Sequence, residues 1–474
     1  MDTLALKKTA SMELNNTKTL VVGLGATGIA TALFLKEQGA QVTVSEKKER
    51  DDLTPEAQHL CSKGVTLETG GHRTETFLSA ELIVVSPGVS LESDALKAAA
   101  AAGVEIISEI ELAYRFITGP IIAVTGTNGK TTTVYLIADL FTASGKQAFL
   151  GGNVGNPLIE YVLNRNLEEY IIAEISSFQL EGIRYFKPFV SVLLNLSHDH
   201  LDRYTSYTDY IAAKVKLFSN QTSKDYAILN ADDPEIQRLA SSISATKLSF
   251  SCEQEVSPGI YCKGDQAYFA HGTEQTTFSL NRITLQGKHN RHNIMAAIAA
   301  GQLCGCSHKA IQQTIETFRG LPHRLEWVGE VDKIQFYNDS KATNVSSAVR
   351  ALESLQPPII LIAGGKDKGG DYQPLTPLIE QKVKTLILIG EAQKKMYKAF
   401  QDTTSIVCAE TLEDAFRKSL ENATEGDTVL LSPACSSFDM FTSYGERGNL
   451  FKTLVKNLSN HLPSENNNGN TQSI

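Results

Sequence analysis

The sequence lacks the features of several protein classes. It has no run of about 18 apolar residues, the length that a membrane-spanning helix needs, and its first residues contain no apolar stretch of signal-peptide length. Basic residues are too few for binding to a phosphate backbone, since 44 Lys and Arg stand against 53 Asp and Glu and the net charge is −9. We therefore expect a cytoplasmic protein whose partners include neither a membrane nor a nucleic acid.

Paired cysteines are absent as well. None of the seven cysteines stands in a CxxC motif, and Cys304 and Cys306 are too close for the usual spacing of zinc ligands. Because cysteine is among the residues most often buried in proteins, we predict that all of them are reduced and mostly buried. They are Cys61, Cys252, Cys262, Cys304, Cys306, Cys408 and Cys435.

The length of 474 residues predicts about three domains. Short β-rich apolar runs alternate with helical stretches, and this alternation predicts α/β units with mostly parallel sheets. The first unit ends near Ser108, and the pattern restarts near residue 321. We therefore expect domains at 1–108, 109–320 and 321–474.

Two further segments depart from this alternation. Residues from about 245 to 285 form short alternating stretches that favour antiparallel strands. The polar, Asn-rich tail from about residue 463 is predicted to be disordered, because it has too little apolar surface to bury.

The strongest local signal is a phosphate-binding loop. It follows an apolar strand and opens a helix, and it contains Gly126, Thr127, Asn128, Gly129, Lys130, Thr131 and Thr132. Glycines let backbone N–H groups turn toward phosphates, the lysine can reach the terminal phosphates, and the threonine after it can bind Mg²⁺. Val124 replaces the first glycine of the common motif, which makes the loop tighter. The plainer alternative is an ordinary βα turn, but the context favours ATP binding and a central P-loop ATPase domain.

A second glycine-rich loop lies near the N-terminus. Gly23, Gly25 and Gly28 form G-x-G-x-x-G after a strand, and Glu46 ends the next strand, about where a ribose-binding acid would stand. The pattern indicates a Rossmann-like first domain and, taken alone, suggests NAD. It is common among α/β proteins and therefore weakly specific.

Several other polar residues follow strands or lie in helical stretches. Glu174 ends an apolar run and is a natural Mg²⁺ ligand near the phosphate loop, or else an exposed charge. His198, Asp199, His200 and Asp202 are clustered, but they lack the His-x-x-x-His spacing of a helical zinc site. Residue 214 is a helical lysine, and its position alone favours a solvated side chain.

Beyond these motifs, the chain resembles the Mur ligase family and its folate-polyglutamate relatives over nearly its whole length. NDSKATN and SPACSSFDMF resemble the D-glutamate-adding member more than its sister enzymes. The motifs that carry the resemblance are GTNGKTTT, GGNVGNP (151–157), AEISSFQL (173–180), NLSHDHLDRY (195–204), AAK (212–214), HNRHN (289–293), LPHR (321–324), NDSKATN (338–344), AGGKDKGG (363–370) and SPACSSFDMF (432–441).

The resemblance implies an activity. It implies that ATP phosphorylates a substrate carboxylate and that an amine attacks the acyl phosphate to form an amide. The implied substrates are UDP-N-acetylmuramoyl-L-alanine and D-glutamate, in cytoplasmic peptidoglycan precursor synthesis by a monomer. Another Mur-type or folylpolyglutamate-type ligase, a nicotinamide oxidoreductase and a non-catalytic nucleotide-binding regulator remain as alternatives.

The resemblance also assigns metal and catalytic residues. It implies two Mg²⁺ sites, with Thr131, Glu174, His200 and Lys214 as ligands, and a carbamate formed from CO₂ on Lys214. A carbamate is an anion that can bind Mg²⁺ where a cationic amine could not, and its formation needs the neutral amine. The implied catalytic residues are Lys130, Glu174, His200 and Lys214.

The remaining assignments concern ligands. The resemblance implies nucleotide contacts from Asn290, Asn293, Arg324 and Asp339. A mobile, Rossmann-like C-terminal domain would hold the amino acid, and the N-terminal loop would bind the uridine diphosphate, although Ser45-Glu46-Lys47 does not clearly match the usual uridine contacts. Lys366 competes with Lys368 for one of the substrate roles. The implied substrate-binding residues are Gly25, Ala26, Thr27, Ser86, Gly88, Asn153, Lys341, Thr343, Lys368, Ser437 and Phe438.

Overall fold

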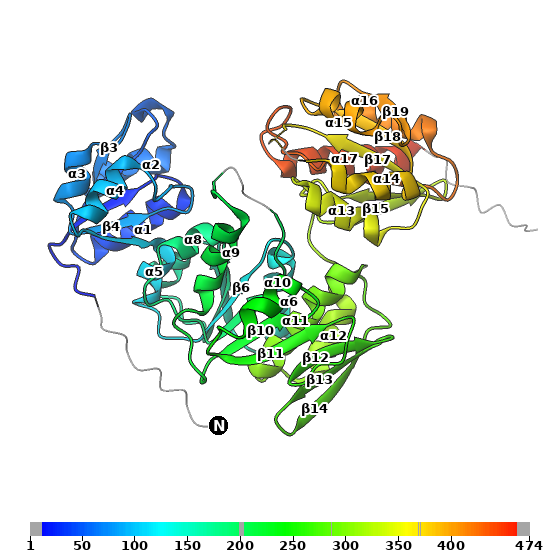
Figure 1. The fold of residues 1–474 in the computed structure, drawn as a ribbon. Helices are drawn as coiled ribbons and strands as arrows, with labels where there is room; N and C mark the ends of the chain where they lie inside the picture. Colours follow the sequence, from blue (N-terminus) through cyan, green and yellow to red (C-terminus); the bar gives the residue numbers. More distant parts are fainter. Residues whose placement is uncertain (1–11, 199–202, 286, 368, 370, 462–474) are drawn as a thin grey trace, which may run out of the picture. The chain divides into compact units, whose positions relative to one another are not determined.

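The computed structural model describes residues 12–198, 203–285, 287–367, 369 and 371–461. The chain forms two compact units (Figure 1). The first runs to Thr284 and includes His289–Phe318, and the second holds Leu285–Lys288 and continues from Arg319. Within the described ranges, no helix has both the length and the apolar character needed to cross a membrane.

The first sheet of unit 1 is wholly parallel, with the strand order β3-β2-β1-β4-β5. Its central strand, β1 (Lys18–Val22), is buried after its first residue and leads into α1 (Ala26–Glu37) through the N-terminal glycine loop. The other strands are β2 (Gln41–Ser45), β3 (Thr66–Glu68), β4 (Leu82–Val85) and β5 (Glu105–Ser108). The loops after β1 and β4 therefore meet at one edge of this sheet.

The second sheet of unit 1 has the order β14-β13-β12-β11-β10-β9-β6-β8-β7. β6 (Ile121–Thr125) is buried at every residue, as expected of a central parallel strand. The other strands are β7 (Ala148–Gly152), β8 (Tyr170–Glu174), β9 (Val190–Leu193), β10 (Tyr226–Asn230), β11 (Thr246–Ser251), β12 (Gly259–Lys263), β13 (Gln266–His271) and β14 (Glu274–Ser279).

The antiparallel prediction for residues 245–285 is wrong for part of that segment. β13 and β14 pair antiparallel, but β11 pairs parallel with both β10 and β12. Alternation of apolar and polar residues reports that one face of a strand is buried, and it does not report the direction of its neighbour.

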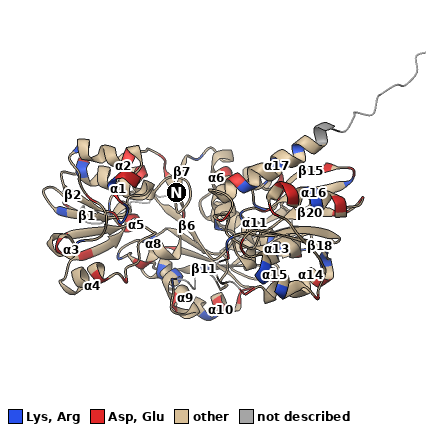
Figure 2. Ribbon diagram, turned by 90° about the horizontal axis from the view of Figure 1, so that it is seen from above, with Lys and Arg blue, Asp and Glu red and all other residues tan. Residues whose placement is uncertain are grey.

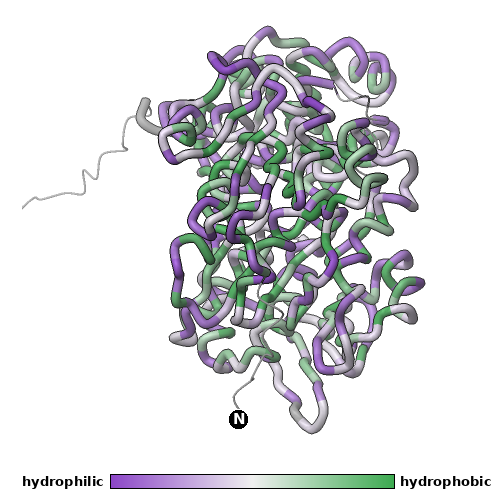
Figure 3. Tube along the Cα trace, turned by 90° about the vertical axis from the view of Figure 1, so that its left-hand side faces the viewer, coloured by the Kyte–Doolittle hydropathy of each residue, from purple (hydrophilic) through white to green (hydrophobic). Residues whose placement is uncertain are grey.

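Helices place the polar residues of this sheet. α6 (Lys130–Ala143) starts directly after the phosphate loop, and α11 (Lys288–Leu303) carries the HNRHN motif. α9 (Tyr207–Val215) carries the AAK motif. Hydrophobic and hydrophilic stretches alternate along the trace in Figure 3, as expected when buried strands are followed by amphipathic helices.

Unit 2 contains a six-stranded sheet with the order β15-β16-β20-β17-β18-β19. β15 (Glu326–Val331) pairs antiparallel with β16 (Ile334–Asn338), and the other described strand pairs of this sheet are parallel. The remaining strands are β17 (Ile359–Gly364), β18 (Val383–Ile389), β19 (Ser405–Cys408) and β20 (Thr428–Leu431), and the helices are α13 (Val345–Ser354), α14 (Thr376–Lys382), α15 (Gln393–Phe400), α16 (Leu412–Asn422) and α17 (Tyr444–His461).

The three sheets fall within the predicted segments 1–108, 109–320 and 321–474, whose boundaries remain predictions. These three sheets, whose strands are mostly parallel and alternate with helices, confirm the predicted α/β fold class. Figure 2 shows Lys and Arg interspersed with Asp and Glu on the described helices. The predicted tail from residue 463 lies outside the described residues.

Candidate active site

The phosphate loop is held by its own backbone and by a neighbouring strand end. Gly126 and Gly129 adopt φ values of 147° and 86°, which residues with a Cβ atom rarely adopt. Asn195, which follows β9, accepts from the Asn128 N–H at 2.9 Å and donates to the Asn128 carbonyl at 2.9 Å. Lys130 Nζ donates to the carbonyls of Gly126 and Thr127, both at 2.9 Å. The lysine therefore lies over the loop.

Glu174 lies at the end of β8, which pairs directly with β6 in the sheet. Its Oε2 accepts a hydrogen bond from Thr131 Oγ1 at 2.7 Å, and its Oε1 accepts one from Asn153 Nδ2 at 2.8 Å. Only 3% of Glu174 is exposed, so the alternative of a solvated strand-end charge is wrong. Three residues that are distant in sequence, Thr131, Asn153 and Glu174, thus form one cluster of oxygen and amide groups.

Lys214 is buried against the same loop. Its exposed fraction is 2%, and its Nζ donates to the Gly126 carbonyl at 3.0 Å and lies 4.6 Å from the centre of the Tyr210 ring. The Tyr210 hydroxyl in turn lies 3.1 Å from Thr127 Oγ1. The alternative reading of Lys214 as a solvated lysine is therefore wrong, whereas Lys216, on the next turn, is exposed.

The amides of α11 lie beside the loop from the other direction. Asn290 and Asn293 are both buried, and Asn293 Nδ2 donates to Asn290 Oδ1 at 3.3 Å. A Cβ placed on Gly129 would lie 2.3 Å from Asn293 Oδ1, so a side chain cannot be accommodated there. The start of α6 and the second turn of α11 therefore meet at Gly129.

The N-terminal glycine loop is tightly closed. A Cβ on Gly28 would lie 2.0 Å from the Gly23 carbonyl, which also accepts from Ser86 Oγ at 3.2 Å. Glu46 Oε2 accepts from the Leu24 N–H at 2.7 Å, so this acid is engaged with the loop itself. Of the other predicted substrate residues here, Gly25, Ala26 and Gly88 are exposed and Thr27 is half-buried.

Unit 2 gathers a second set of predicted residues. Asp339 is buried, and its carboxylate accepts from Ser432 Oγ at 2.8 Å and from the Leu325 N–H at 3.0 Å. Burial raises the pKa of Asp339 to about 7, although these hydrogen bonds and the nearby Arg324 and Arg447 act to lower it.

The predicted amino-acid residues of unit 2 differ in exposure. Lys341 Nζ lies 4.0 Å above the ring of Tyr444, and Thr343 is half-buried in the same loop. Ser437 is 2% exposed, while Phe438 is 66% exposed.

Arg447 is a residue of this region that the sequence analysis missed. It is 1% exposed on α17 and donates to the carbonyls of Ser340 at 2.8 Å and Cys435 at 3.3 Å, and to Ser340 Oγ at 2.9 Å. It thereby joins the loop that carries Lys341 to the loop that carries Ser437. No local motif marks it, because its partners lie up to 107 residues away.

Two predicted site residues, His200 and Lys368, lie outside the described residues. Their neighbours can be placed. The ring of His198 is exposed and stacks on Tyr207 with centroids 4.1 Å apart, which agrees with its interpretation as a loop side chain. Lys366 is exposed, and its backbone N–H donates to the Ser436 carbonyl at 2.9 Å.

Three family models match consecutive parts of the chain. The Mur ligase MurD-like N-terminal domain matches residues 17–108, the Mur ligase middle domain matches residues 124–301, and the Mur ligase glutamate ligase domain matches residues 323–435. The chain is also 48% identical to the UDP-N-acetylmuramoylalanine--D-glutamate ligase of Geotalea uraniireducens, with 94% of this chain and 99% of that protein covered. The chain belongs to the Mur ligase family.

Other comparisons place this Mur ligase among relatives of the same kind. The UDP-N-acetylmuramoylalanine--D-glutamate ligase of Citrifermentans bemidjiense is 46% identical, with 94% of this chain and 98% of that protein covered. The solved pseudomurein peptide ligase type C of Methanothermus fervidus has a TM-score of 0.59 at 20% identity, with 94% of this chain and 100% of that chain covered. At that identity the likeness concerns the fold alone, and it supports the three-domain Mur ligase architecture.

Proposed function

We propose that this Mur ligase adds D-glutamate to UDP-N-acetylmuramoyl-L-alanine with hydrolysis of ATP to ADP and phosphate, in peptidoglycan precursor synthesis. The chain is an ATP-dependent acid–amino-acid ligase. The observation that carries the proposal is the cluster around the phosphate loop, where Thr131, Glu174 and Lys214 meet the loop that Lys130 covers. The 48% identity to a ligase of that name supports the choice of substrates.

The proposed reaction has two steps. The γ-phosphoryl group leaves ADP and forms a P–O bond with the substrate carboxylate, giving an acyl phosphate. The amine of D-glutamate then attacks the acyl carbon, phosphate departs, and the nitrogen loses a proton as the amide forms. Both steps depend on positioning and on neutralising phosphate charge. We assign this role to Lys130, which reaches the loop carbonyls at 2.9 Å and would turn toward the terminal phosphates.

The residues at the loop fit Mg²⁺. Thr131 Oγ1 and the Glu174 carboxylate are hard oxygen donors within 2.7 Å of each other, and Mg²⁺ takes such ligands together with phosphate oxygens and water. A bound Mg²⁺ supplies charge neutralisation to the phosphates. Asn153, which holds the second oxygen of Glu174, would orient that carboxylate and contact substrate.

For Lys214 we propose a carbamate. The neutral amine would attack the carbon of CO₂ and lose a proton, leaving one negative charge shared by the two oxygens of the carbamate. Burial of Lys214 supports this, since burial disfavours the charged form of an amine, and the contact with the Gly126 carbonyl places the nitrogen at the phosphate loop. His200 and the carbamate would complete a second Mg²⁺ site.

The ligand roles are also proposals. Asn290 and Asn293 would read the adenine edge with their amides, as paired donors and acceptors can, and Arg324 and Asp339 would contact the nucleotide. Lys341, Thr343, Ser437 and Phe438 would hold D-glutamate, with Lys341 pairing a carboxylate and either Lys366 or Lys368 assisting. Gly25, Ala26, Thr27, Ser86 and Gly88 would bind the uridine diphosphate group. We propose a cytoplasmic monomer.

The decisive experiment is phosphate release from ATP with UDP-N-acetylmuramoyl-L-alanine, comparing D-glutamate with L-glutamate and other amino acids. Release that requires both the UDP substrate and D-glutamate is the expected result. Release with another amine or acceptor would keep the ligase class and overturn the substrate assignment. ATP binding without release under any pairing would overturn catalysis.

A further inference from the structure

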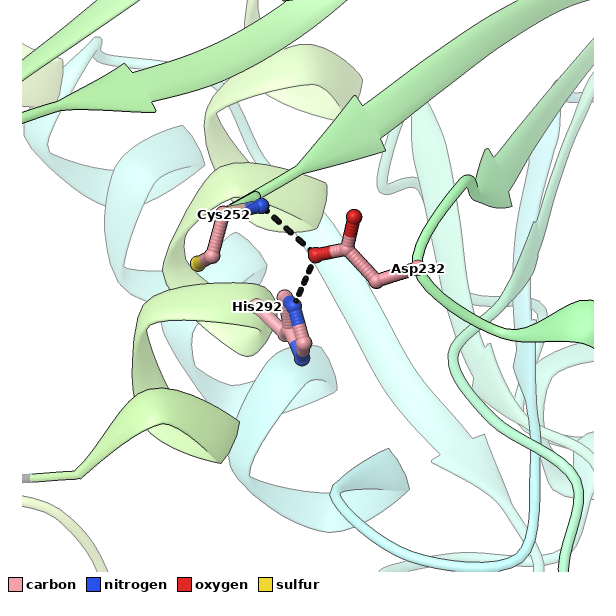
Figure 4. Close-up of side chains that lie close together, drawn as sticks. All are labelled: Asp232, Cys252 and His292. Carbon is pink, nitrogen blue, oxygen red and sulfur yellow. Dashed lines mark hydrogen bonds and ion pairs between the residues drawn. The ribbon is translucent and has the colours of Figure 1, made fainter. Parts of the chain in front are cut away.

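A cluster of metal-ligating side chains lies apart from the proposed Mg²⁺ site. Asp232 follows β10, Cys252 follows β11, and His292 belongs to the second turn of α11. One ligand atom from each lies within 4.8 Å of the others. Figure 4 shows the Asp232 carboxylate between the backbone nitrogen of Cys252 and the ring of His292. Two strand ends and a helix thus bring an oxygen, a sulfur and a nitrogen ligand together.

The Asp232 carboxylate is held by hydrogen bonds to both of its oxygens. Asp232 Oδ2 accepts from the Cys252 N–H at 2.7 Å and lies 2.8 Å from His292 Nε2, and Oδ1 accepts from Ser251 Oγ at 2.5 Å. Hydrogen bonds of this kind also occur in networks that bind no metal. The case for a metal site therefore depends on the sulfur of Cys252, which lies beside the carboxylate and the imidazole.

A second sulfur lies next to the first. β11 and β12 pair parallel with Ser251 opposite Tyr261, so Cys252 and Cys262 follow as neighbours, and their Sγ atoms are 3.9 Å apart. Cys262 Sγ also lies 3.1 Å from Met295 Sδ, and it is not among the three ligand atoms that lie within 4.8 Å of one another. Cys262 therefore flanks the cluster as a neighbouring sulfur.

We propose that Asp232, Cys252 and His292 form a binding site for Zn²⁺ or a similar borderline divalent cation. One sulfur, one imidazole nitrogen and one carboxylate oxygen make a donor set that zinc accepts with water as the fourth ligand, whereas Mg²⁺ prefers oxygen. The site is thus chemically distinct from the oxygen cluster of Thr131 and Glu174.

The cation would tie α11 to the sheet. His292 stands between Asn290 and Asn293, and the other two ligands follow the ends of β10 and β11. Metal binding would fix the first turns of α11 and so the two amides beside Gly129. Because a preformed site is absent in the unfolded chain, binding also stabilises the fold.

The test uses Co²⁺ as a spectroscopic substitute for Zn²⁺ on the metal-stripped full chain, kept reduced with a phosphine. We expect one equivalent of Co²⁺ to produce a thiolate-to-cobalt charge-transfer band that Zn²⁺ abolishes by displacement. Cys252→Ser and His292→Gln should each weaken binding at least about tenfold. Cys262→Ser leaves all three ligands in place and should retain the band.

Control variants distinguish metal binding at this site from binding by another cysteine and from loss of folding. Cys408→Ser changes an exposed cysteine of unit 2 and should leave the band unchanged. Gln at 292 keeps a donor for Asp232, and far-UV circular dichroism checks that each variant is folded. Zn²⁺ should raise the thermal midpoint of the parent protein and not that of His292→Gln. Absence of a thiolate band, or a band that persists in both Cys252→Ser and His292→Gln, would overturn the proposal.

Discussion

Thr131 Oγ1 donates a 2.7 Å hydrogen bond to Glu174 Oε2, which joins the first turn of α6 to the end of β8. Asn153 holds the other carboxylate oxygen at 2.8 Å. Both oxygens of a buried acid are therefore oriented before any ligand arrives. Such preorganisation lowers the reorganisation that a catalytic site must undergo when a cation and phosphates bind.

The hydroxyl of Thr131 is expected to matter for turnover and little for folding. Thr131→Val preserves the shape of the side chain but removes the hydroxyl that we propose as a Mg²⁺ ligand. We therefore expect kcat to fall about 100-fold and the Mg²⁺ concentration needed for half-maximal activity to rise. Thr131→Ser restores the oxygen and should retain most of the activity. Phosphate release over a Mg²⁺ titration measures both. Equal activity of the Val and Ser variants would contradict the assigned role.

Carbamylation of Lys214 predicts a spectroscopic signal. When the protein is incubated with ¹³C-bicarbonate, a carbamate carbon resonance should appear. In Lys214→Ala this resonance should be absent, and the activity should fall roughly 100-fold or more. The matched control is Lys216→Ala, which changes an exposed lysine of the adjoining turn. It should keep both the resonance and the activity. A resonance that survives in Lys214→Ala would place the label elsewhere.

Glu109 makes stability depend on pH. Burial raises the pKa of this carboxyl from 4.5 to about 7, against hydrogen bonds from the N–H groups of Ile159 and Leu158. The folded state therefore holds one more proton than the unfolded state between those values, so the free energy of unfolding falls as pH rises from 4.5 to 7. The loss is about 3 kcal/mol, at about 1.4 kcal/mol per pKa unit.

Glu109→Gln removes that titration. We expect the variant to lose this part of the pH dependence and to be more stable than the parent at pH values above the raised pKa of Glu109. Urea unfolding at several pH values measures the effect. The exposed Glu92→Gln serves as the control and should leave the pH profile unchanged. A parent-like slope in Glu109→Gln would show that another group titrates.

Arg447 is expected to act as a positioning residue. Its guanidinium joins the Ser340 loop to the Cys435 loop, and lysine cannot reproduce that fork of donors. Arg447→Lys should raise KM for D-glutamate about tenfold or more, since small displacements of substrate-holding groups are costly. KM for UDP-N-acetylmuramoyl-L-alanine should change little. If both KM values stay fixed while only thermal stability falls, Arg447 has a structural role alone.

What the sequence determined by itself is local. Gly126–Thr132 are contiguous, and the strand before them and the helix after them are short-range patterns, so the loop and its chemistry could be predicted without coordinates. The three α/β units follow from the same kind of pattern. The resemblance to a family added Lys214, whose helical position alone favours a solvated side chain.

Tertiary structure decided the rest, because parallel sheets bring together strand ends that are far apart in sequence. Only the pairing of β6 with β8 places Glu174 beside Thr131, and only burial shows that Lys214 faces the loop. The alternation of apolar and polar residues does not show whether neighbouring strands run parallel. The parallel pairing of β11 with β12, which brings Cys252 next to Cys262, could therefore be seen only in the structure. The sequence does not reveal the role of Arg447 for the same physical reason, because its partners lie far from it in the chain and most of them are backbone carbonyls, which carry no sequence signal.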